Sequence, residues 1–403
     1  MTMRPITSTI AFASALEIIL DAARPIARTE TVTLLEADGR VLAHDVIATE
    51  DVPPFDRAAM DGFAVIAGDT AGASAESPRT LRCVDRVFSG HVPARGVGAA
   101  ECMEIATGAP MPAGADAVVM VEETARDGEM VQILAPVVPR QNIGRQGADL
   151  TTGEVIVAGN EVLNPSRIGA LAATGVTRVE VFAKPTVALL STGDEIVQPG
   201  ERLAPGQIYD INRFTLETII SRHGGRAMPM PAARDSVDAL VERLDAARVN
   251  DIVVFSGGSS VGERDLLLDV IAQRGELIFR GIAVKPGKPT IFARVGPTPF
   301  FGMPGYPASC LSNAYMLVLP FLRKMARLPP WEPRTVEVPL ARRVTSAAGR
   351  HQFYTVRVVS GRAEPAFKAS GDITSMARAD GYIEIPADTE AVEAGTLVRV
   401  TYF

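Results

Sequence analysis

The stretch from Asp251 to Asp265, DIVVFSGGSSVGERD, decides the fold of the central part of the chain. Its unbroken apolar run, residues 252–255, is typical of a strand that is buried on both faces of a parallel sheet. A loop rich in glycine and serine follows at once, and apolar residues then recur with helical spacing up to Ile271. The block therefore predicts a strand, a glycine loop and a helix.

A loop of this kind favours anion binding. Glycines let the backbone approach a phosphate, serine hydroxyls add donors, and free N–H groups at a helix start carry partial positive charge. The glycine spacing matches neither G-x-x-x-x-G-K-[ST] nor G-x-G-x-x-G, so the loop alone fits a tight turn without ligand equally well. The candidate phosphate-binding residues are Ser256, Gly257, Gly258, Ser259, Ser260 and Gly262.

Strand and helix patterns alternate around this block. Strands are expected at 186–190, 227–230, 251–255, 278–284 and 299–301, and helices at 213–223, 237–247, 265–274 and 309–325. Such alternation predicts a three-layer α/β domain with a parallel or mixed sheet. Because ligands of open α/β sheets lie outside the carboxyl ends of the strands, we expect four polar, glycine-bearing turns to converge on one crevice. These turns are residues 191–195, 256–262, 285–289 and 302–305.

The rest of the chain predicts a multidomain protein of α/β and β segments. We assign an N-terminal and linker domain to 1–50 and 146–181, an inserted β domain to 51–145, the α/β domain to 182–330, and a small C-terminal β-barrel or sandwich to 331–403. Pro329-Pro330 cannot continue the preceding helix and sets the last boundary. Asn164 followed by Pro165 predicts a helix start in the linker.

The composition excludes several classes of protein. A chain of 403 residues with 47% apolar and 22% charged residues is an ordinary globular one, and its net charge of -7 disfavours a general nucleic-acid surface. Three cysteines far apart in sequence predict no disulfide framework, and four histidines without metal-ligand spacing disfavour zinc. No apolar run is long enough to span a membrane, so we expect a cytoplasmic protein.

Carboxylates and lysines form the candidate chemical site. Asp61 stands in a tight-turn signal, MDGF, while Thr107 and Asp149 lie in polar loops that also fit plain solvated turns. Oxygen ligands without cysteine or histidine suit Mg²⁺, and lysines supply point charges for an oxyanion. The full candidate set is Asp61, Asp149, Asp194, Glu195, Asp235 and Asp265 with Lys285 and Lys288.

Seven ordered motifs carry a family resemblance. They are PPFDRAAMDGFA at 53–64, ATGAPMPAGADAVVMVE at 106–122, LLSTGDEI at 189–196, GQIYDINR at 206–213, VVFSGGSSVGERD at 253–265, VKPGKP at 284–289 and GMPGYPAS at 302–309. Together they resemble the molybdopterin molybdenumtransferase family, which includes the gephyrin E domain. The resemblance covers essentially the whole chain and is weakest in the last 70 residues.

The resemblance implies an elongated homodimer of four domains, the third of which is similar to molybdopterin adenylyltransferase. It implies that adenylylated molybdopterin and molybdate give molybdenum cofactor and AMP with the help of Mg²⁺. A molybdopterin adenylyltransferase and molybdoenzyme apoproteins are implied as partners, and neither nucleic acid nor a membrane is. The alternatives are a non-catalytic pterin-binding or scaffolding relative and a different nucleotide-dependent or sugar-phosphate enzyme on a similar sheet.

Carried over by motif, the implied catalytic residues are Asp61, Thr107, Asp149, Glu195, Asp235, Asp265 and Lys285. We expect Glu195, Asp235 and Asp265 to bind Mg²⁺ or to position water, and the two lysines to stabilise oxyanions. Asp61 and Thr107 are expected to reach in from the partner subunit. The chain departs from the family pattern at three places: Gly281 replaces a basic residue, Tyr306 replaces an asparagine, and Arg57-Ala58 stands where Asn-Ser is common.

Overall fold

The structure is a computed structural model that describes residues 6, 8–193, 195–234, 236–257 and 266–403. The chain divides into two compact units. The larger unit contains residues 182–403, residues 39–41 and the N-terminal segment up to residue 30, and the smaller unit contains 31–38 and 42–181.

A six-stranded mixed sheet forms the centre of the larger unit. Its order is β16 (Arg226–Pro229), β13 (Thr186–Ser191), β17 (Ile252–Ser256), β21 (Thr298–Met303), β20 (Ile291–Val295) and β18 (Gly275–Arg280). The first four strands are parallel, and β20 runs antiparallel to both of its neighbours. Strand β18 therefore points the same way as β21, and both end at the same edge of the sheet.

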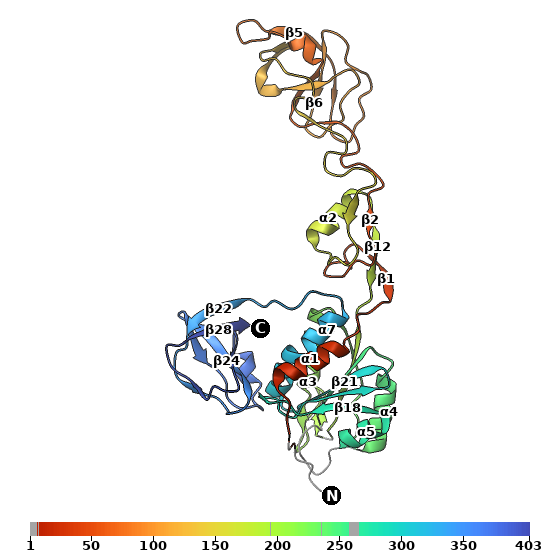
Figure 1. Ribbon diagram of the computed structural model, residues 1–403. Coiled ribbons are helices and arrows are strands. Elements are labelled where there is room, and N and C mark those ends of the chain that lie inside the picture. Colours follow the sequence, from red (N-terminus) through yellow and green to blue (C-terminus); the bar gives the residue numbers. More distant parts are fainter. Residues whose placement is uncertain (1–5, 7, 194, 235, 258–265) are drawn as a thin grey trace. The chain divides into compact units, whose positions relative to one another are not determined.

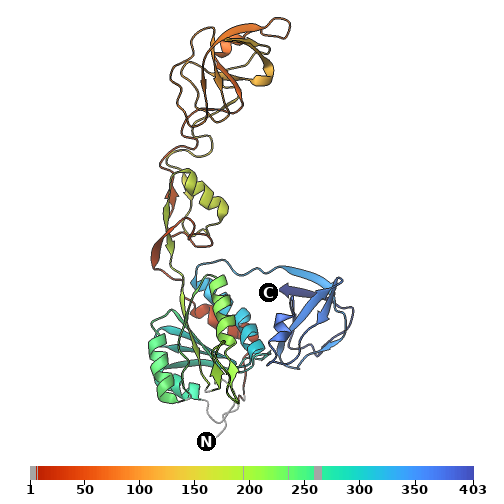
Figure 2. The ribbon, with the colours of Figure 1, turned by 180° about the vertical axis from the view of Figure 1, so that it is seen from behind.

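Helices cover both faces of this sheet, as Figures 1 and 2 show from opposite sides. They are α1 (Phe12–Ala22), α3 (Asn212–Arg222), α4 (Val237–Ala247), α5 (Leu266–Arg274), α6 (Pro307–Asn313) and α7 (Leu319–Met325). Side chains of β17 alternate between two cores. Val254 packs with α1, α3 and α7, whereas Phe255 packs with α4 and α5. The three-layer prediction is confirmed.

The strand expected at 278–284 is wrong in its bounds. Strand β18 ends at Arg280 because Gly281 takes a left-handed conformation with φ of +90°. The chain then forms the short strand β19 (Val284–Lys285), which pairs with another sheet. Strand β20, the antiparallel partner of both β18 and β21, was not predicted from the sequence.

The helix expected at 309–325 is one helical segment with an irregular middle. Helix α6 passes into a π-helical turn, Ala314–Val318, before α7 continues to Met325. Pro320 lies just beyond this turn and has no N–H to donate, so the regular hydrogen-bond ladder cannot run through it.

The C-terminal segment forms a small barrel of short strands. The sheet order is β19, β24 (His351–Val359), β26 (Gly381–Ile385), β28 (Leu397–Tyr402) and β22 (Thr335–Pro339), and β25 (Arg362–Pro365) also pairs with β24. A bridge from Leu340 to Ala363 closes the sheet between β22 and β25. The segment also contains β23 (Val344–Thr345), β27 (Ala391–Val392) and α8 (Thr374–Ala377).

The smaller unit is mostly β-structure, as expected. Its main sheet has the order β7 (Ala117–Met120), β4 (Gly62–Val65), β6 (Glu101–Ile105), β5 (Arg79–Val87), β9 (Met130–Ile133) and β8 (Thr124–Asp127). Short pairs are β1 (Thr29–Thr33) with β12 (Arg178–Phe182), β2 (Val46–Ile47) with β11 (Val155–Val157), and β3 (Arg57–Ala58) with β10 (Ile143–Gly144). The Asn164 side chain caps the N-terminus of α2 (Pro165–Ala173) by accepting a hydrogen bond from Arg167 N–H, as predicted.

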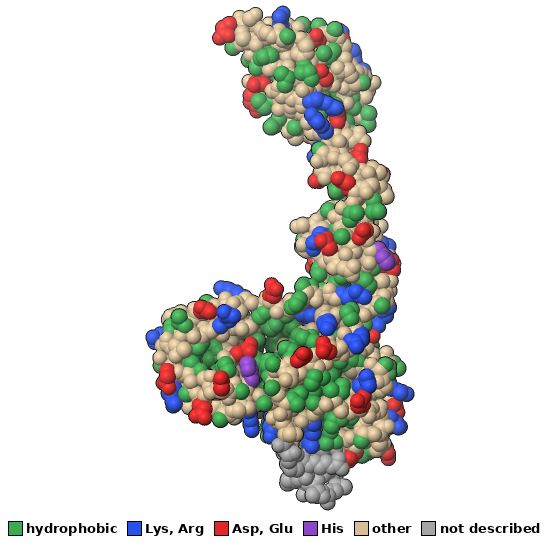
Figure 3. All heavy atoms as spheres, viewed as in Figure 1, with side chains coloured by type: hydrophobic (Ala, Val, Ile, Leu, Met, Phe, Trp, Pro, Cys, Tyr) green, Lys and Arg blue, Asp and Glu red, His purple; other side chains and the backbone are tan. Residues whose placement is uncertain are grey.

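The surface offers no broad field of one charge on the face drawn in Figure 3, where acidic and basic side chains are interspersed. Within the described part of the chain, no helix is both long and apolar enough to cross a bilayer.

Candidate active site at the carboxyl edge of the sheet

Three strand ends lie side by side at one edge of the α/β sheet. Ser191 ends β13, Ser256 ends β17 and Met303 ends β21, and each is in register with its neighbour. Thr192 N–H donates to Ser256 O over 3.3 Å, which joins the first two ends beyond the strands. The loops that follow these strands therefore begin at one place, as the sequence predicts.

Gly257 opens the phosphate-binding loop in a conformation that requires glycine. Its φ is +113°, and a Cβ at this position would lie 2.6 Å from Thr192 O. The same Cα lies 3.7 Å from the Cβ position of Gly305, so the loops after β17 and β21 meet here. The predicted loop residues Gly258, Ser259, Ser260 and Gly262 lie outside the described residues, as does Asp265.

Glu195 follows β13 at the same edge and its side chain is exposed. Its carboxylate folds back onto Gly193, where a Cβ would lie 2.6 Å from Oε2. The other two predicted metal ligands, Asp235 and Asp265, and the neighbouring Asp194 lie outside the described residues. Among the residues that are described, no three histidine, cysteine, aspartate or glutamate side chains are grouped to hold a metal.

Two polar residues that the sequence analysis did not assign hold these loops together. Asp210 is 4% exposed and accepts hydrogen bonds from Ser191 Oγ over 2.9 Å and from Arg213 N–H over 3.0 Å. Asn212 Nδ2 donates to Gly305 O over 2.9 Å. The motif GQIYDINR contained the available signal, because an aspartate just before a helical pattern favours an N-terminal capping role.

The lysine loop, residues 285–290, lies beyond β18 at this edge. Lys285 and Lys288 are half-buried, and Lys288 Nζ donates to Ile6 O over 3.3 Å. The departure at position 281 has a steric reason, because a Cβ there would lie 2.6 Å from Ile6 Cγ2. Tyr306, another departure from the family pattern, is 67% exposed at the start of α6, next to Gly305.

The smaller unit brings Asp61 and Thr107 together. Asp61 immediately precedes β4 and Thr107 follows β6, and these strands pair with Gly62 opposite Ile105. Asp61 Oδ1 accepts from Thr107 N–H over 2.7 Å and from Thr107 Oγ1 over 2.9 Å. The backbone N–H and then the hydroxyl hold the pKa of Asp61 below its ordinary value, so this carboxylate is ionised at neutral pH.

Asp149 lies on another loop of the smaller unit, where its side chain is exposed and its backbone N–H donates to Val52 O over 2.9 Å. Its backbone is thus fixed next to the extended segment at residues 51–53. No hydrogen bond of the described residues joins it to Asp61 or Thr107.

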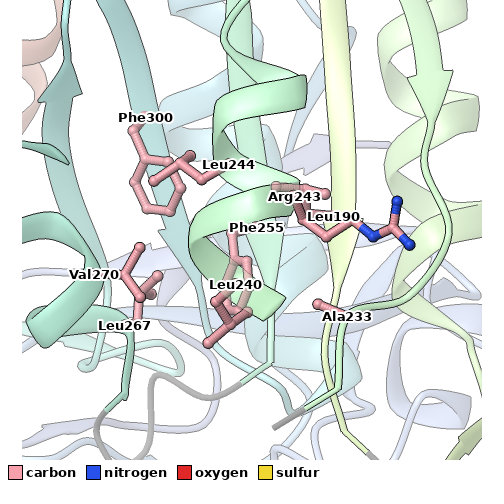
Figure 4. Close-up of a pocket in the computed structure, with 9 residues that line it drawn as sticks. All are labelled: Leu190, Ala233, Leu240, Arg243, Leu244, Phe255, Leu267, Val270 and Phe300. Atoms are coloured by element: carbon pink, nitrogen blue, oxygen red, sulfur yellow. The ribbon is translucent and has the colours of Figure 1, made fainter. Parts of the chain in front are cut away.

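An apolar pocket lies between the sheet and helices α4 and α5 (Figure 4). Its lining consists of Leu190, Ala233, Leu240, Arg243, Leu244, Phe255, Leu267, Val270 and Phe300. The nitrogens of Arg243 point away from the other side chains in Figure 4. This pocket offers no donor to a phosphate, and most of its walls belong to the hydrophobic core.

Comparisons with known proteins identify the family to which the chain belongs. Residues 10–175 match the MoeA N-terminal region (domain I and II), residues 188–324 match a probable molybdopterin binding domain, and residues 337–403 match the MoeA C-terminal region (domain IV). Two solved MoeA proteins from Pyrococcus horikoshii superimpose with TM-scores of 0.84 and 0.80, at 39% and 32% identity. Each comparison covers 98% of this chain and at least 99% of the solved chain.

Curated relatives agree with the structural matches. A molybdopterin molybdenumtransferase of Nostoc sp. is 34% identical over 92% of this chain and 88% of its own length. Molybdopterin molybdenumtransferase 2 of Mycobacterium tuberculosis is 33% identical over 95% of this chain and 96% of its own length. With its motifs, its sheet and its loops placed as described, the chain belongs to the molybdopterin molybdenumtransferase family.

Proposed function

We propose that this protein is a molybdenum insertase of molybdenum cofactor biosynthesis, which converts adenylylated molybdopterin and molybdate to molybdenum cofactor and AMP. The main support is that the Gly257 loop and the lysine loop lie at the same edge of the sheet. Gly257 would let the backbone approach a phosphate closely at this edge, and the lysine loop would supply the ammonium groups. Family membership along most of the chain supports the reaction.

We propose Mg²⁺ as the metal, held by Glu195, Asp235 and Asp265. The exposed Glu195 carboxylate at the sheet edge fits this assignment, because Mg²⁺ prefers oxygen ligands and keeps several waters. When bound, the ion offsets negative charge on the phosphoanhydride oxygens. The chain itself contributes the lysines, which stabilise the oxyanions, and the loops, which orient the pterin phosphate.

We propose that the active form is a homodimer in which Asp61 and Thr107 of one subunit complete the site of the other. The lowered pKa of Asp61 supports a role for a carboxylate that is ionised at neutral pH. We also propose a cytoplasmic location, which the three free cysteines support. A molybdopterin adenylyltransferase as the source of the substrate and molybdoenzyme apoproteins as recipients of the product complete the proposal.

The first test incubates the pure protein with adenylylated molybdopterin, molybdate and Mg²⁺ and measures AMP release. We expect AMP to form with the wild type and to fall by about 10²-fold or more in Lys285→Met and Asp265→Ala, since each variant removes one preorganised charge. Lys368→Met, an exposed lysine of the C-terminal segment, is the control and should keep normal rates.

The outcomes separate the candidate functions. Binding of the adenylylated pterin without AMP release would identify a non-catalytic pterin-binding relative. Failure to bind it would contradict the insertase and favour another nucleotide-dependent or sugar-phosphate enzyme. Normal turnover in folded Asp265→Ala would show that the metal-site assignment is wrong.

A further inference from the structure

The lysine loop is fixed on one side by the C-terminal sheet. Strand β19 pairs in parallel with β24, with Val284 opposite His351 and Lys285 opposite Gln352. His351 N–H donates to Ala283 O over 2.9 Å at the start of this pairing. The backbone of Lys285 thus belongs to a sheet, while the loop that follows it needs another support.

Asn313, the last residue of α6, supplies that support from the other side. It is fully buried, and its Nδ2 donates to Gly287 O over 2.9 Å and to Thr290 Oγ1. The Thr290 hydroxyl donates to the same Gly287 O over 2.9 Å. Gly287 has φ of +103°, and a Cβ there would lie 2.3 Å from Asn313 Oδ1. The loop is therefore shaped around this one amide group.

The amide oxygen of Asn313 indicates that this residue is not present for stability alone. Its Oδ1 has no hydrogen-bond partner among the residues that the structure describes. A buried acceptor without a partner is destabilising, and an apolar side chain of similar shape would avoid that cost. What an apolar side chain would lose is the pair of N–H donors that hold Gly287 and Thr290.

The two lysines between these supports are unusual in this chain. Of its 40 lysine and arginine residues, only five are lysines: Lys184, Lys285, Lys288, Lys324 and Lys368. Two of the five stand in the lysine loop. Lysine carries a compact point charge and arginine a planar fork, and the loop has lysine where most other basic positions of the chain have arginine.

We propose that Asn313 is a positioning residue for the insertion reaction: its amide holds the lysine loop so that Lys285 and Lys288 face the anionic part of the substrate. The inference rests on the proposed function for the role of the two lysines. The loop is then placed by the side chain of Asn313, which lies more than 20 residues further along the chain and on a different element.

The test compares Asn313→Leu with Ser312→Ala as the matched control. Ser312 is the buried neighbour on α6, and its hydroxyl contacts Met376 Sδ at 3.8 Å instead of the loop. We expect kcat for AMP release to fall by about 10- to 100-fold in Asn313→Leu, because a misplaced loop loses alignment, and to change little in Ser312→Ala. KM should change by less than kcat if the lysines act mainly on the developing charge.

A second readout does not depend on turnover. Acetylation of each lysine by an N-hydroxysuccinimide ester is followed by mass spectrometry, with and without molybdopterin. In Asn313→Leu we expect Lys285 and Lys288 to react several-fold faster and to lose protection by the pterin. Lys184 and Lys368, which are exposed and remote in sequence, should keep their wild-type rates. A merely structural role would change the melting temperature without this selectivity.

If Asn313→Leu does not fold, Thr290→Val tests the same contact from the loop side, because it removes the hydroxyl that Asn313 holds. Wild-type kcat and unchanged lysine acetylation in a folded variant would overturn the proposal. A wild type that releases no AMP would instead contradict the proposed function, and the acetylation pattern would still decide the role of Asn313. Full activity in Lys285→Met would overturn the lysine assignment.

Discussion

Asp61 is a candidate site carboxylate whose pKa is shifted by hydrogen bonds to one neighbouring residue. Its pKa is lowered first by Thr107 N–H and then by the Thr107 hydroxyl. The ionised form is favoured in the folded state, so its contribution to stability is complete above the ordinary aspartate pKa of about 4 and is lost as the pH falls through the folded value.

We expect Thr107→Val to raise the pKa of Asp61 but to leave it below the ordinary value, because the backbone N–H, the larger cause, is retained. A carboxyl ¹³C titration of the labelled protein measures this change. Asp56 is the internal control, since Gln146 N–H lowers its pKa and Thr107 does not contribute. An unchanged Asp61 titration in Thr107→Val would show that the hydroxyl has no effect.

The residues that were named from the sequence differ from those that were missed in whether a local motif marks them, since Asp61 itself bonds to a residue 46 positions away, Thr107. Asp61 and Lys285 stand in compact motifs whose chemistry can be recognised locally. Asp210 bonds to Ser191, 19 residues away, and Asn313 bonds to Gly287, 26 residues away. Nothing in the sequence near Asn313 marks it, because its role exists only once α6 and the lysine loop are packed together.

At the scale of the element, the residue that follows helix α3, His223, has a strongly shifted pKa. Burial, then Arg323 and Arg222, lower the pKa of His223 to about 4, and its ring lies edge-on to Trp331 with a centroid separation of 5.8 Å. The unfolded chain therefore binds a proton between about pH 6.5 and 4 that the folded chain does not. Stability falls as the pH is lowered through this window.

We expect His223→Gln to reduce the loss of stability between pH 7 and pH 5, because glutamine takes up no proton in either state. Urea unfolding midpoints at the two pH values measure the difference. His91→Gln, at an exposed position of the smaller unit, is the control and should leave the wild-type pH dependence intact. An identical loss in His223→Gln and wild type would contradict the assignment.

The elements also show why some of the fold was predictable and some was not. Continuous apolar runs such as residues 252–255 identify buried strands, since both faces of the sheet are covered. The bounds of β18 and the separate strand β19 were missed because a single glycine, Gly281, redirects the chain between two sheets. Apolar periodicity does not record such a turn.

For the whole molecule, the proposed dimer makes a quantitative prediction. Asp61→Asn and Lys285→Met are each expected to be nearly inactive alone. If each site takes Asp61 from one subunit and Lys285 from the other, a mixed dimer has one intact site, and random co-assembly should restore about a quarter of wild-type AMP release. Co-expressed variants carrying two different tags allow the mixed dimer to be purified and assayed.

No recovery in the purified mixed dimer would mean that both residues of a site come from one subunit. Recovery with Asp61→Asn and Thr107→Val, two changes in the same contact, is not expected, and that pair serves as the control. A protein that is monomeric at assay concentrations and fully active would contradict the dimer altogether.

The sharing of β19 between the α/β segment and the C-terminal barrel has one further consequence. Residues 331–403 do not form an independent domain, because the edge strand of their sheet is β19, which lies before α6 in the sequence. A chain terminated at Pro330 would leave β19 with unsatisfied hydrogen-bonding groups and would uncover the Tyr315 ring, which packs against Trp331 and Phe403. A nonsense mutation that removes the barrel should therefore damage the lysine loop at a distance, although every residue of that loop is still translated.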